Sequence, residues 1–107
     1  MKELTIKDFQ KILADFEKEY WVAPKGMDEQ TRHVTLHLTK LLGKIGGVCE
    51  KREHGFDTDT DIIKREVIPD LFYYALSLSE IYNVDLEKAF LERLETNRKK
   101  VSGWKKR

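Results

Sequence analysis

The chain contains segments in which apolar residues recur every three or four positions, separated by short segments rich in turn-forming residues. This spacing places the apolar residues of each segment on one face of a helix. The stripe of the first segment consists of Phe9, Ile12, Leu13 and Phe16. Thr5 followed by Asp8 resembles a capping box with aspartate in place of glutamate. We therefore expect a helix from Thr5 to Tyr20, ended by the breaker sequence at residues 23–26.

A second, longer segment repeats the pattern. Its stripe consists of Val34, Leu38, Leu41, Leu42, Ile45, Val48 and Cys49. We expect this helix to begin at Asp28, a good N-cap, and to end at His54 before Gly55. Each interior glycine costs ~1 kcal/mol relative to alanine. The three glycines are Gly43, Gly46 and Gly47. They indicate either close approach of another helix or ligand, or drift of the sequence without a structural reason.

The third and fourth segments have the same periodicity, but the third contains a proline. The third stripe consists of Ile62, Ile63, Val67, Leu71, Ala75, Leu78 and Ile81, with an expected end near Asn83. Pro69 removes a backbone hydrogen bond and clashes with the preceding turn. The helix therefore either kinks there or consists of two pieces, with Pro69 near the start of the second. Asp85 is the expected cap of a fourth helix that runs to Lys100. Its expected buried stripe is Leu86, Ala89, Phe90 and Leu94.

No segment shows the alternation typical of strands, so we predict an all-α antiparallel four-helix bundle in one domain, residues 1–107. The wide apolar faces favour a homo-oligomer. A formal net charge of +1 gives no overall field to attract nucleic acid or an anionic membrane. Cys49 is the single cysteine, which excludes an internal disulfide. The start of the chain lacks a signal-peptide core and no apolar run reaches membrane length, so we expect a cytoplasmic location.

Four stretches together resemble the MazG-like family of all-α nucleoside triphosphate pyrophosphohydrolases: residues 41–50, 68–75, 84–90 and 96–100. The resemblance covers residues 30–100. It implies a four-helix unit that dimerises or tetramerises. It also implies acids of EExxE type on the second helix and of ExxD type on the third, which hold Mg²⁺ against a triphosphate. The implied reaction releases pyrophosphate from a nucleotide, with the metal polarising the phosphoryl oxygens and activating water.

Most of the acids that the resemblance implies are replaced in this chain. The second-helix positions are occupied by Lys40, Leu41, Lys44 and Gly47. In the third helix Val67 stands where a glutamate is expected, and only Asp70 matches. Glu66 is adjacent to Val67 but lies ~100° around the helix. The candidate metal ligands are therefore Asp70 and Glu50, and with Glu66 these are the candidate catalytic acids. Mg²⁺ is expected only if the protein is active.

Asp70 and Lys44 each have two interpretations. Asp70 is either a surviving metal ligand or a structural residue that pairs with a basic side chain such as Lys44. Lys44, together with Lys40, either replaces the metal as the positive charge that binds phosphate or forms an ordinary solvated helix edge.

The fourth helix keeps more of the family pattern. Arg93, Asn97 and Lys100 have the spacing of a row that contacts phosphate, although a basic last turn is also favoured by the helix dipole. Trp21 lies where relatives place aromatic residues near the base, so it either stacks on a nucleotide or packs in the core.

Two further features have both a functional and a simpler interpretation. His33 and His37 are one turn apart, a spacing that can chelate zinc, but histidine pairs on a polar helix edge are commoner. Residues 101–107 are a basic tail with Trp104 in it, which either contacts nucleic acid or solubilises the protein. We favour the second, so nucleic acid is not an expected partner.

The sequence thus predicts a degenerate MazG-like protein that self-associates and binds a nucleotide or phosphate-bearing ligand, with weak or lost pyrophosphohydrolase activity. Two alternatives stay open. One is an active enzyme that uses acids among Glu50, Glu53, Glu66 and Asp70. The other is a non-enzymatic, homo-oligomeric interaction protein.

Overall fold

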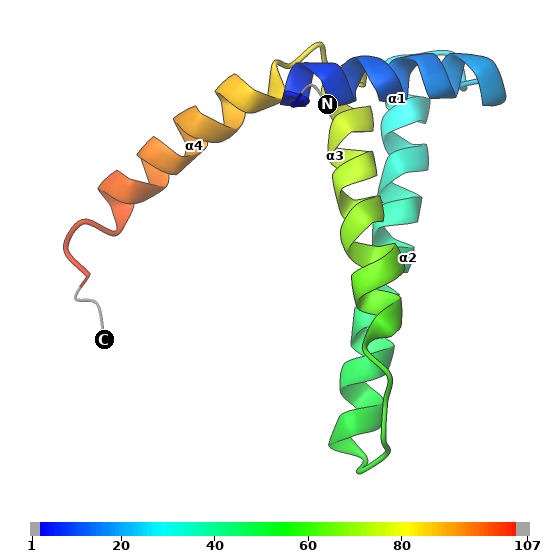
Figure 1. Cartoon of the computed structure of the whole chain (residues 1–107), viewed down its shortest axis with the longest axis vertical. Helices are drawn as coiled ribbons and strands as arrows, with labels where there is room; N and C mark the ends of the chain where they lie inside the picture. Colours follow the sequence, from blue (N-terminus) through cyan, green and yellow to red (C-terminus); the bar gives the residue numbers. More distant parts are fainter. Residues whose placement is uncertain (1–2, 105–107) are drawn as a thin grey trace.

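The computed structural model describes residues 3–104, which form four α-helices and contain no strand. The helices are α1 (Ile6–Tyr20), α2 (Met27–Glu53), α3 (Ile68–Ile81) and α4 (Leu86–Lys100), and a π-helical turn, η1 (Ile63–Val67), directly precedes α3. α2 and α3 lie side by side and antiparallel, α1 crosses one end of this pair, and α4 leads away from it (Figure 1). The predicted all-α class and helical bundle character are confirmed, with α4 outside the packed helices.

Side-chain caps begin two of the helices. The capping box is confirmed: the Asp8 N–H donates to Thr5 Oγ1 at 3.2 Å, and the Thr5 N–H donates to Asp8 Oδ2 at 2.8 Å. At α4, the Lys88 N–H donates to the Asp85 carboxylate at 3.2 Å, as expected of a cap. The predicted cap at Asp28 is wrong. α2 begins at Met27, after Gly26, which has a φ of 88°. Asp28 therefore lies in the first turn, where the helix dipole stabilises its negative charge.

The structure decides between the two interpretations of Pro69. The helical segment changes from a π-turn to an α-helix at Ile68, so Pro69 lies in the first turn of α3. The Ile68 N–H donates to the Ile63 carbonyl, one residue further back than in an α-helix. Pro69 has no N–H, and its ring would clash with the Arg65 carbonyl in a regular helix. A wider π-turn relieves this clash without ending the helix.

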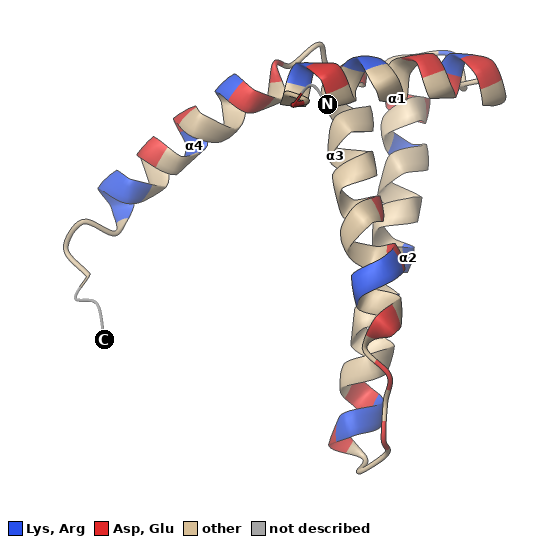
Figure 2. Cartoon of the chain, in the orientation of Figure 1, with Lys and Arg blue, Asp and Glu red and all other residues tan. Residues whose placement is uncertain are grey.

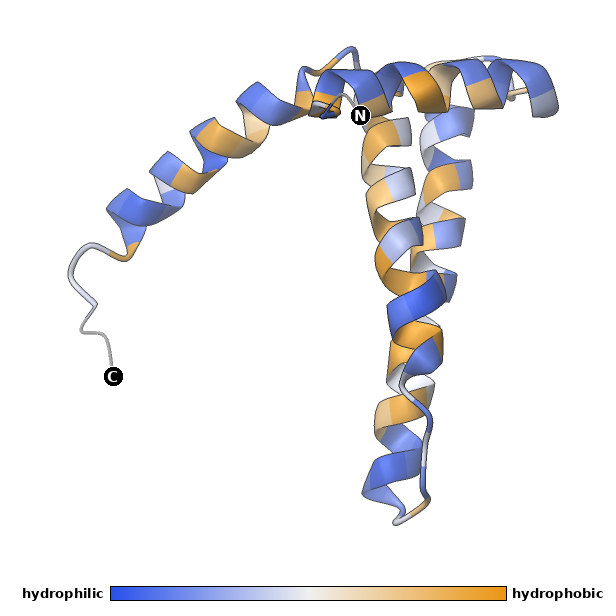
Figure 3. Ribbon diagram, viewed as in Figure 1, coloured by the Kyte–Doolittle hydropathy of each residue, from blue (hydrophilic) through white to orange (hydrophobic). Residues whose placement is uncertain are grey.

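The buried apolar core is small and lies between α1, α2 and α3. It consists of Leu13, Val34, Leu41, Val67 and Leu76. The predicted buried stripe of α4 is wrong, because no residue of α4 is buried and Phe90 is 58% exposed. Figure 3 shows this apolar stripe along the free helix. Cys49 was expected to continue the core stripe of α2 but is exposed. No helix within residues 3–104 combines the length and apolar character needed to cross a membrane.

Candidate functional site

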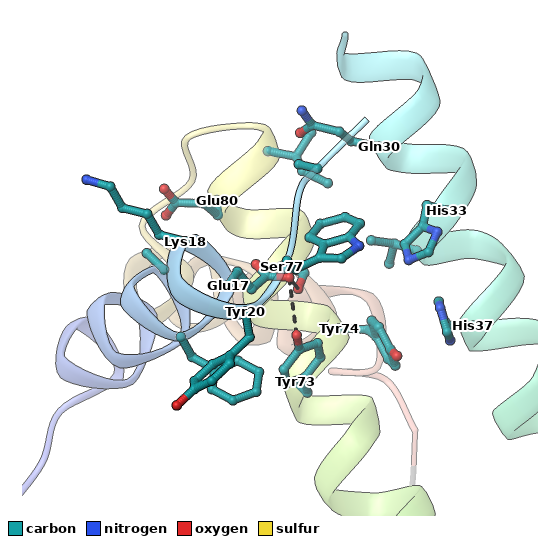
Figure 4. A pocket seen from close by; sticks show the side chains of 16 residues that line it. Glu17, Lys18, Tyr20, Gln30, His33, His37, Tyr73, Tyr74, Ser77 and Glu80 are labelled. Atoms are coloured by element: carbon teal, nitrogen blue, oxygen red, sulfur yellow. Dashed lines mark hydrogen bonds between the residues drawn. The ribbon is translucent and has the colours of Figure 1, made fainter. Parts of the chain in front are cut away.

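A cavity of about 710 Å³ lies where α1, the segment after it, α2 and α3 meet (Figure 4). It occupies the end of the α2–α3 pair that has few charged residues (Figure 2). Its lining includes side chains from the last turns of α1, from the first half of α2 and from α3 between Tyr73 and Ile81. Among them are Glu17, Lys18, Trp21, Gln30, His33, His37, Tyr73, Tyr74, Ser77 and Glu80. A volume of this size is typical of small-molecule sites.

A continuous run of aromatic rings lines the cavity. Trp21 stacks on His33 with centroids 4.9 Å apart and an interplanar angle of 27°. His33 contacts His37 edge to face at 4.6 Å, and His37 stacks on Tyr74 at 5.1 Å and 14°. Tyr73 meets Tyr74 edge to face at 4.9 Å. The rings from α2 share a face because His33 and His37 are one helical turn apart. Stacked and edge-to-face contacts alternate along this wall, so it offers ring faces on which a planar ligand can stack.

One carboxylate faces this aromatic wall. Tyr73 Oη donates a hydrogen bond of 3.2 Å to Glu17 Oε2, and Ser77 Oγ lies 3.4 Å from the same oxygen. Ser77 is buried, so the two donors hold Glu17 from inside the packed region. No Lys or Arg of residues 3–104 forms an ion pair with Glu17. Its negative charge therefore remains available to a ligand.

The pKa values of the ring side chains favour their neutral forms. Burial, followed by the charge of Glu17 and its hydrogen bond, raises the pKa of Tyr73 to about 12. Burial also raises the pKa of Tyr74, with the charges of Asp70 and Glu17 adding to it. Burial, His33 and Lys40 lower the pKa of His37, and the nearby Asp70 acts in the opposite direction. These shifts favour the uncharged forms of His37, Tyr73 and Tyr74 at neutral pH.

The residues expected to hold a metal are not brought together. Lys44 Nζ lies 3.7 Å from Glu66 Oε1, so Lys44 pairs with Glu66 and not with Asp70. Asp70 is half-buried near His37 and Tyr74. Glu50 lies six residues beyond Lys44 on α2, ~9 Å further along the axis and away from Asp70. Residues 3–104 contain no group of three His, Cys, Asp or Glu side chains able to hold a metal ion.

These positions do not fit a Mg²⁺ site, because such a site needs several oxygen ligands around one point. An ammonium group occupies the place next to Glu66, and its positive charge would repel a divalent cation. His33 and His37 also lack a third ligand in the described part of the chain, so the zinc interpretation gains no support.

The basic row of α4 is separate from the cavity. Arg93, Asn97 and Lys100 are exposed, and none of them lines it. α4 is joined to α1 near its own start, where Gln10 Nε2 donates to the Val84 carbonyl at 2.9 Å and Lys7 lies 3.6 Å from Asp85. From there the helix leads away (Figure 1). Of the basic tail, residues 105–107 lie outside the described residues.

The sequence interpretation identified Trp21 but missed Glu17 and Ser77. Glu17 follows Phe16 within an amphipathic helix and has no motif around it, so nothing local distinguishes it from a solvated acid. The one-turn spacing of His33 and His37 was visible, but it was interpreted as an ordinary pair on a polar helix edge, with zinc as the alternative, and not as part of a stacked wall. No family model, curated protein or solved structure matches the chain.

Proposed function

We propose that this protein binds a nucleotide, or another ligand that joins a planar heteroaromatic ring to phosphate, and that its Mg²⁺-dependent pyrophosphohydrolase activity is weak or lost. The observation behind the proposal is the wall of rings from Trp21 to Tyr74 in a cavity of about 710 Å³. Nucleobases stack on aromatic side chains with ~1–3 kcal/mol per base. A ring of that kind packed against these side chains would bury one of its faces on the wall.

Positive charge for the phosphate lies on α2 beyond the residues that line the cavity. Lys40 and Lys44 follow His37 on α2 after one and two helical turns, on roughly the same face. Lys44 is paired with Glu66, but both side chains are partly exposed, at 36% and 54%. An exposed pair of this kind is worth only ~0–1 kcal/mol, so Lys44 is free to exchange Glu66 for a phosphate.

The same lysine explains why hydrolysis is expected to be weak. A lysine neutralises phosphate charge, but it does not activate a water molecule as a bound metal does. The MazG-like resemblance supports the nucleotide as ligand, and the residues around Lys44 support the loss of the metal-dependent step.

Calorimetry with deoxynucleoside mono- and triphosphates tests the proposal. We expect Trp21→Ala to weaken binding of both ligands, because stacking area is lost. We expect Lys44→Glu to abolish triphosphate binding, because the phosphate then meets two carboxylates. Lys51→Glu, an exposed position further along α2, is the matched control and should retain binding. Absence of binding by the wild-type protein, or unchanged binding by Lys44→Glu, would contradict the proposal.

The surface of the chain favours a second role, which is self-association. A compact protein of 12.6 kDa exposes about 6,200 Å², whereas this chain exposes 9171 Å² and has a radius of gyration of 17.3 Å. The excess of roughly 3,000 Å² is larger than the ~800 Å² that each partner buries in a standard interface. We propose that a second copy of the chain covers this surface.

The apolar face of α4 is the clearest part of that surface. Phe90, Leu91 and Leu94 are 58%, 60% and 44% exposed on a helix with no buried residue. An apolar groove of about 370 Å³ between α1 and α3 offers a complementary surface. If the two features meet in the dimer, each copy of α4 packs on its partner.

Sedimentation equilibrium tests the assembly. We expect wild-type protein to be a dimer or larger, and Leu94→Glu to be a monomer. Thr96→Glu places the same charge at an exposed polar position of α4 and should leave the assembly intact. Circular dichroism checks that both variants keep their helices. A monomeric wild-type protein would reject self-association, while assembly without any nucleotide binding would favour a purely structural interaction protein.

A further inference from the structure

Glu17 lines the aromatic cavity, and one of its two carboxylate oxygens accepts no hydrogen bond from residues 3–104. Both hydrogen bonds that it accepts, from Tyr73 and Ser77, go to Oε2. The other oxygen, Oε1, accepts no hydrogen bond from residues 3–104. The same residues contain no buried side-chain nitrogen or oxygen atom that lacks a hydrogen-bond partner. Oε1 is thus left to a ligand, while the hydrogen bonds to Oε2 fix the carboxylate. A ligand on the aromatic wall meets an acceptor of defined position.

The Glu17 carboxylate can interact with a ligand only as a hydrogen-bond acceptor. A carboxylate accepts hydrogen bonds and donates none, so the ligand edge beside it must supply an N–H group. Tyr73 does not change this, because its pKa of about 12 keeps the hydroxyl protonated, and the hydroxyl donates a hydrogen bond to Glu17. A carbonyl oxygen placed against Glu17 would meet negative charge and lose its bond to water.

The rings themselves do not distinguish one base from another. Every nucleobase has a π-face, so stacking on residues such as Trp21 and Tyr74 tolerates any of them. Base edges do differ: cytosine and adenine carry an amino group where uracil or thymine, and hypoxanthine, carry a carbonyl. The oxo bases also carry a ring N–H, but it lies next to a carbonyl oxygen that would face the negative charge of Glu17. The fixed acceptor beside the wall is therefore the group able to distinguish the two kinds of base.

We propose that Glu17 determines ligand specificity, by selecting nucleobases with an exocyclic amino group over their oxo counterparts. This proposal rests on the proposed nucleotide-binding function. Tyr73 is a positioning residue in it, because it acts by holding the Glu17 carboxylate.

Calorimetry with matched ligand pairs tests the selection. The pairs are dCMP with dUMP and dAMP with dIMP, which differ in each case by an amino group against a carbonyl. We expect wild-type protein to bind the amino member of each pair at least ~10-fold more tightly, as a good base contact allows. Glu17→Gln keeps the size of the side chain and adds a donor, so the preference should vanish or reverse. Glu19→Gln, on the same helix but not lining the cavity, is the control and should retain it.

Tyr73→Phe separates positioning from folding. We expect it to narrow the ratio of dCMP to dUMP affinity, while a general packing defect would weaken both ligands equally. Binding of both members of each pair with equal affinity, or a preference unchanged in Glu17→Gln, would overturn the role of Glu17 and leave nucleotide binding standing. Binding of none of the four ligands would overturn both proposals.

Discussion

The ammonium group of Lys44 lies 3.7 Å from the carboxylate of Glu66, across the contact between α2 and the π-turn that precedes α3. Val67, the next residue, is fully buried. Here a lysine and a glutamate neutralise each other on facing segments. The pair is the structural basis for expecting binding without metal-dependent turnover.

Nucleotide binding should not require a divalent cation. In the proposed function Lys44, and not a metal, supplies the positive charge near the phosphate, so we expect EDTA to change the dissociation constant for a nucleotide by less than about twofold. Pyrophosphate release from a panel of deoxynucleoside triphosphates should stay near background with Mg²⁺ or Mn²⁺. Metal-dependent release that is lost in Asp70→Ala would instead establish the active-enzyme alternative.

Val67 is expected to be a stability determinant of the η1–α3 junction. Its side chain has 0% exposure, so Val67→Ala leaves a cavity, and we expect the free energy of unfolding to fall by about 2 kcal/mol. Val22→Ala is the matched control, since Val22 is 93% exposed and the same truncation should cost almost nothing. Urea unfolding of the three proteins at one concentration measures the difference. Equal stability of the two variants would contradict the burial of Val67.

Alanine at Gly46 should stabilise the isolated chain. A Cβ there meets nothing within 4 Å, so Gly46→Ala should raise the free energy of unfolding by about 1 kcal/mol through helix propensity alone. Gly26→Ala should have the opposite effect, because Gly26 has φ of +88° and its Cβ would meet the Glu29 carboxylate. Thermal or urea unfolding checks both signs. A loss of stability or of assembly in Gly46→Ala would show that another chain packs against this face of α2.

The stability of the fold should fall as the pH drops below 6.5. Burial, His33 and Lys40 lower the pKa of His37 from its usual value of 6.5. Between the lowered pKa of His37 in the folded chain and its pKa of 6.5 in the unfolded chain, the unfolded chain binds a proton at His37 more readily. Stability from this group is complete above pH 6.5 and is lost as the pH falls toward the folded pKa. Urea unfolding on either side of pH 6.5 measures the decline.

Substitution of single histidines shows which residue causes the loss of stability at low pH. We expect His37→Gln to reduce it, whereas His54→Gln, at an exposed position after α2, should leave it unchanged. Proton NMR titration of the wild-type histidines provides an independent check. A pKa of His37 at or above 6.5 would show that Asp70 outweighs the burial of the ring.

The sequence by itself determined the helices and most of their ends. The capping box of Thr5 and Asp8 and the cap at Asp85 were predicted correctly, because each involves residues three positions apart and depends only on local geometry. The helix periodicity was equally local. The same reasoning failed at α4, where Phe90 is exposed, because a hydrophobic stripe indicates that a face is buried but does not identify what buries it.

The tertiary structure alone decided the site. Tyr73 donates to Glu17 across 56 positions of sequence, and Trp21 reaches His33 only because the chain reverses between α1 and α2. The partner of Lys44 depended on the π-turn before Pro69, which sets where Glu66 lies around the helix. Sequence patterns predict contacts between residues that lie within one or two turns of the same helix. Contacts between distant segments follow from how the helices pack, and that packing is a property of the whole chain.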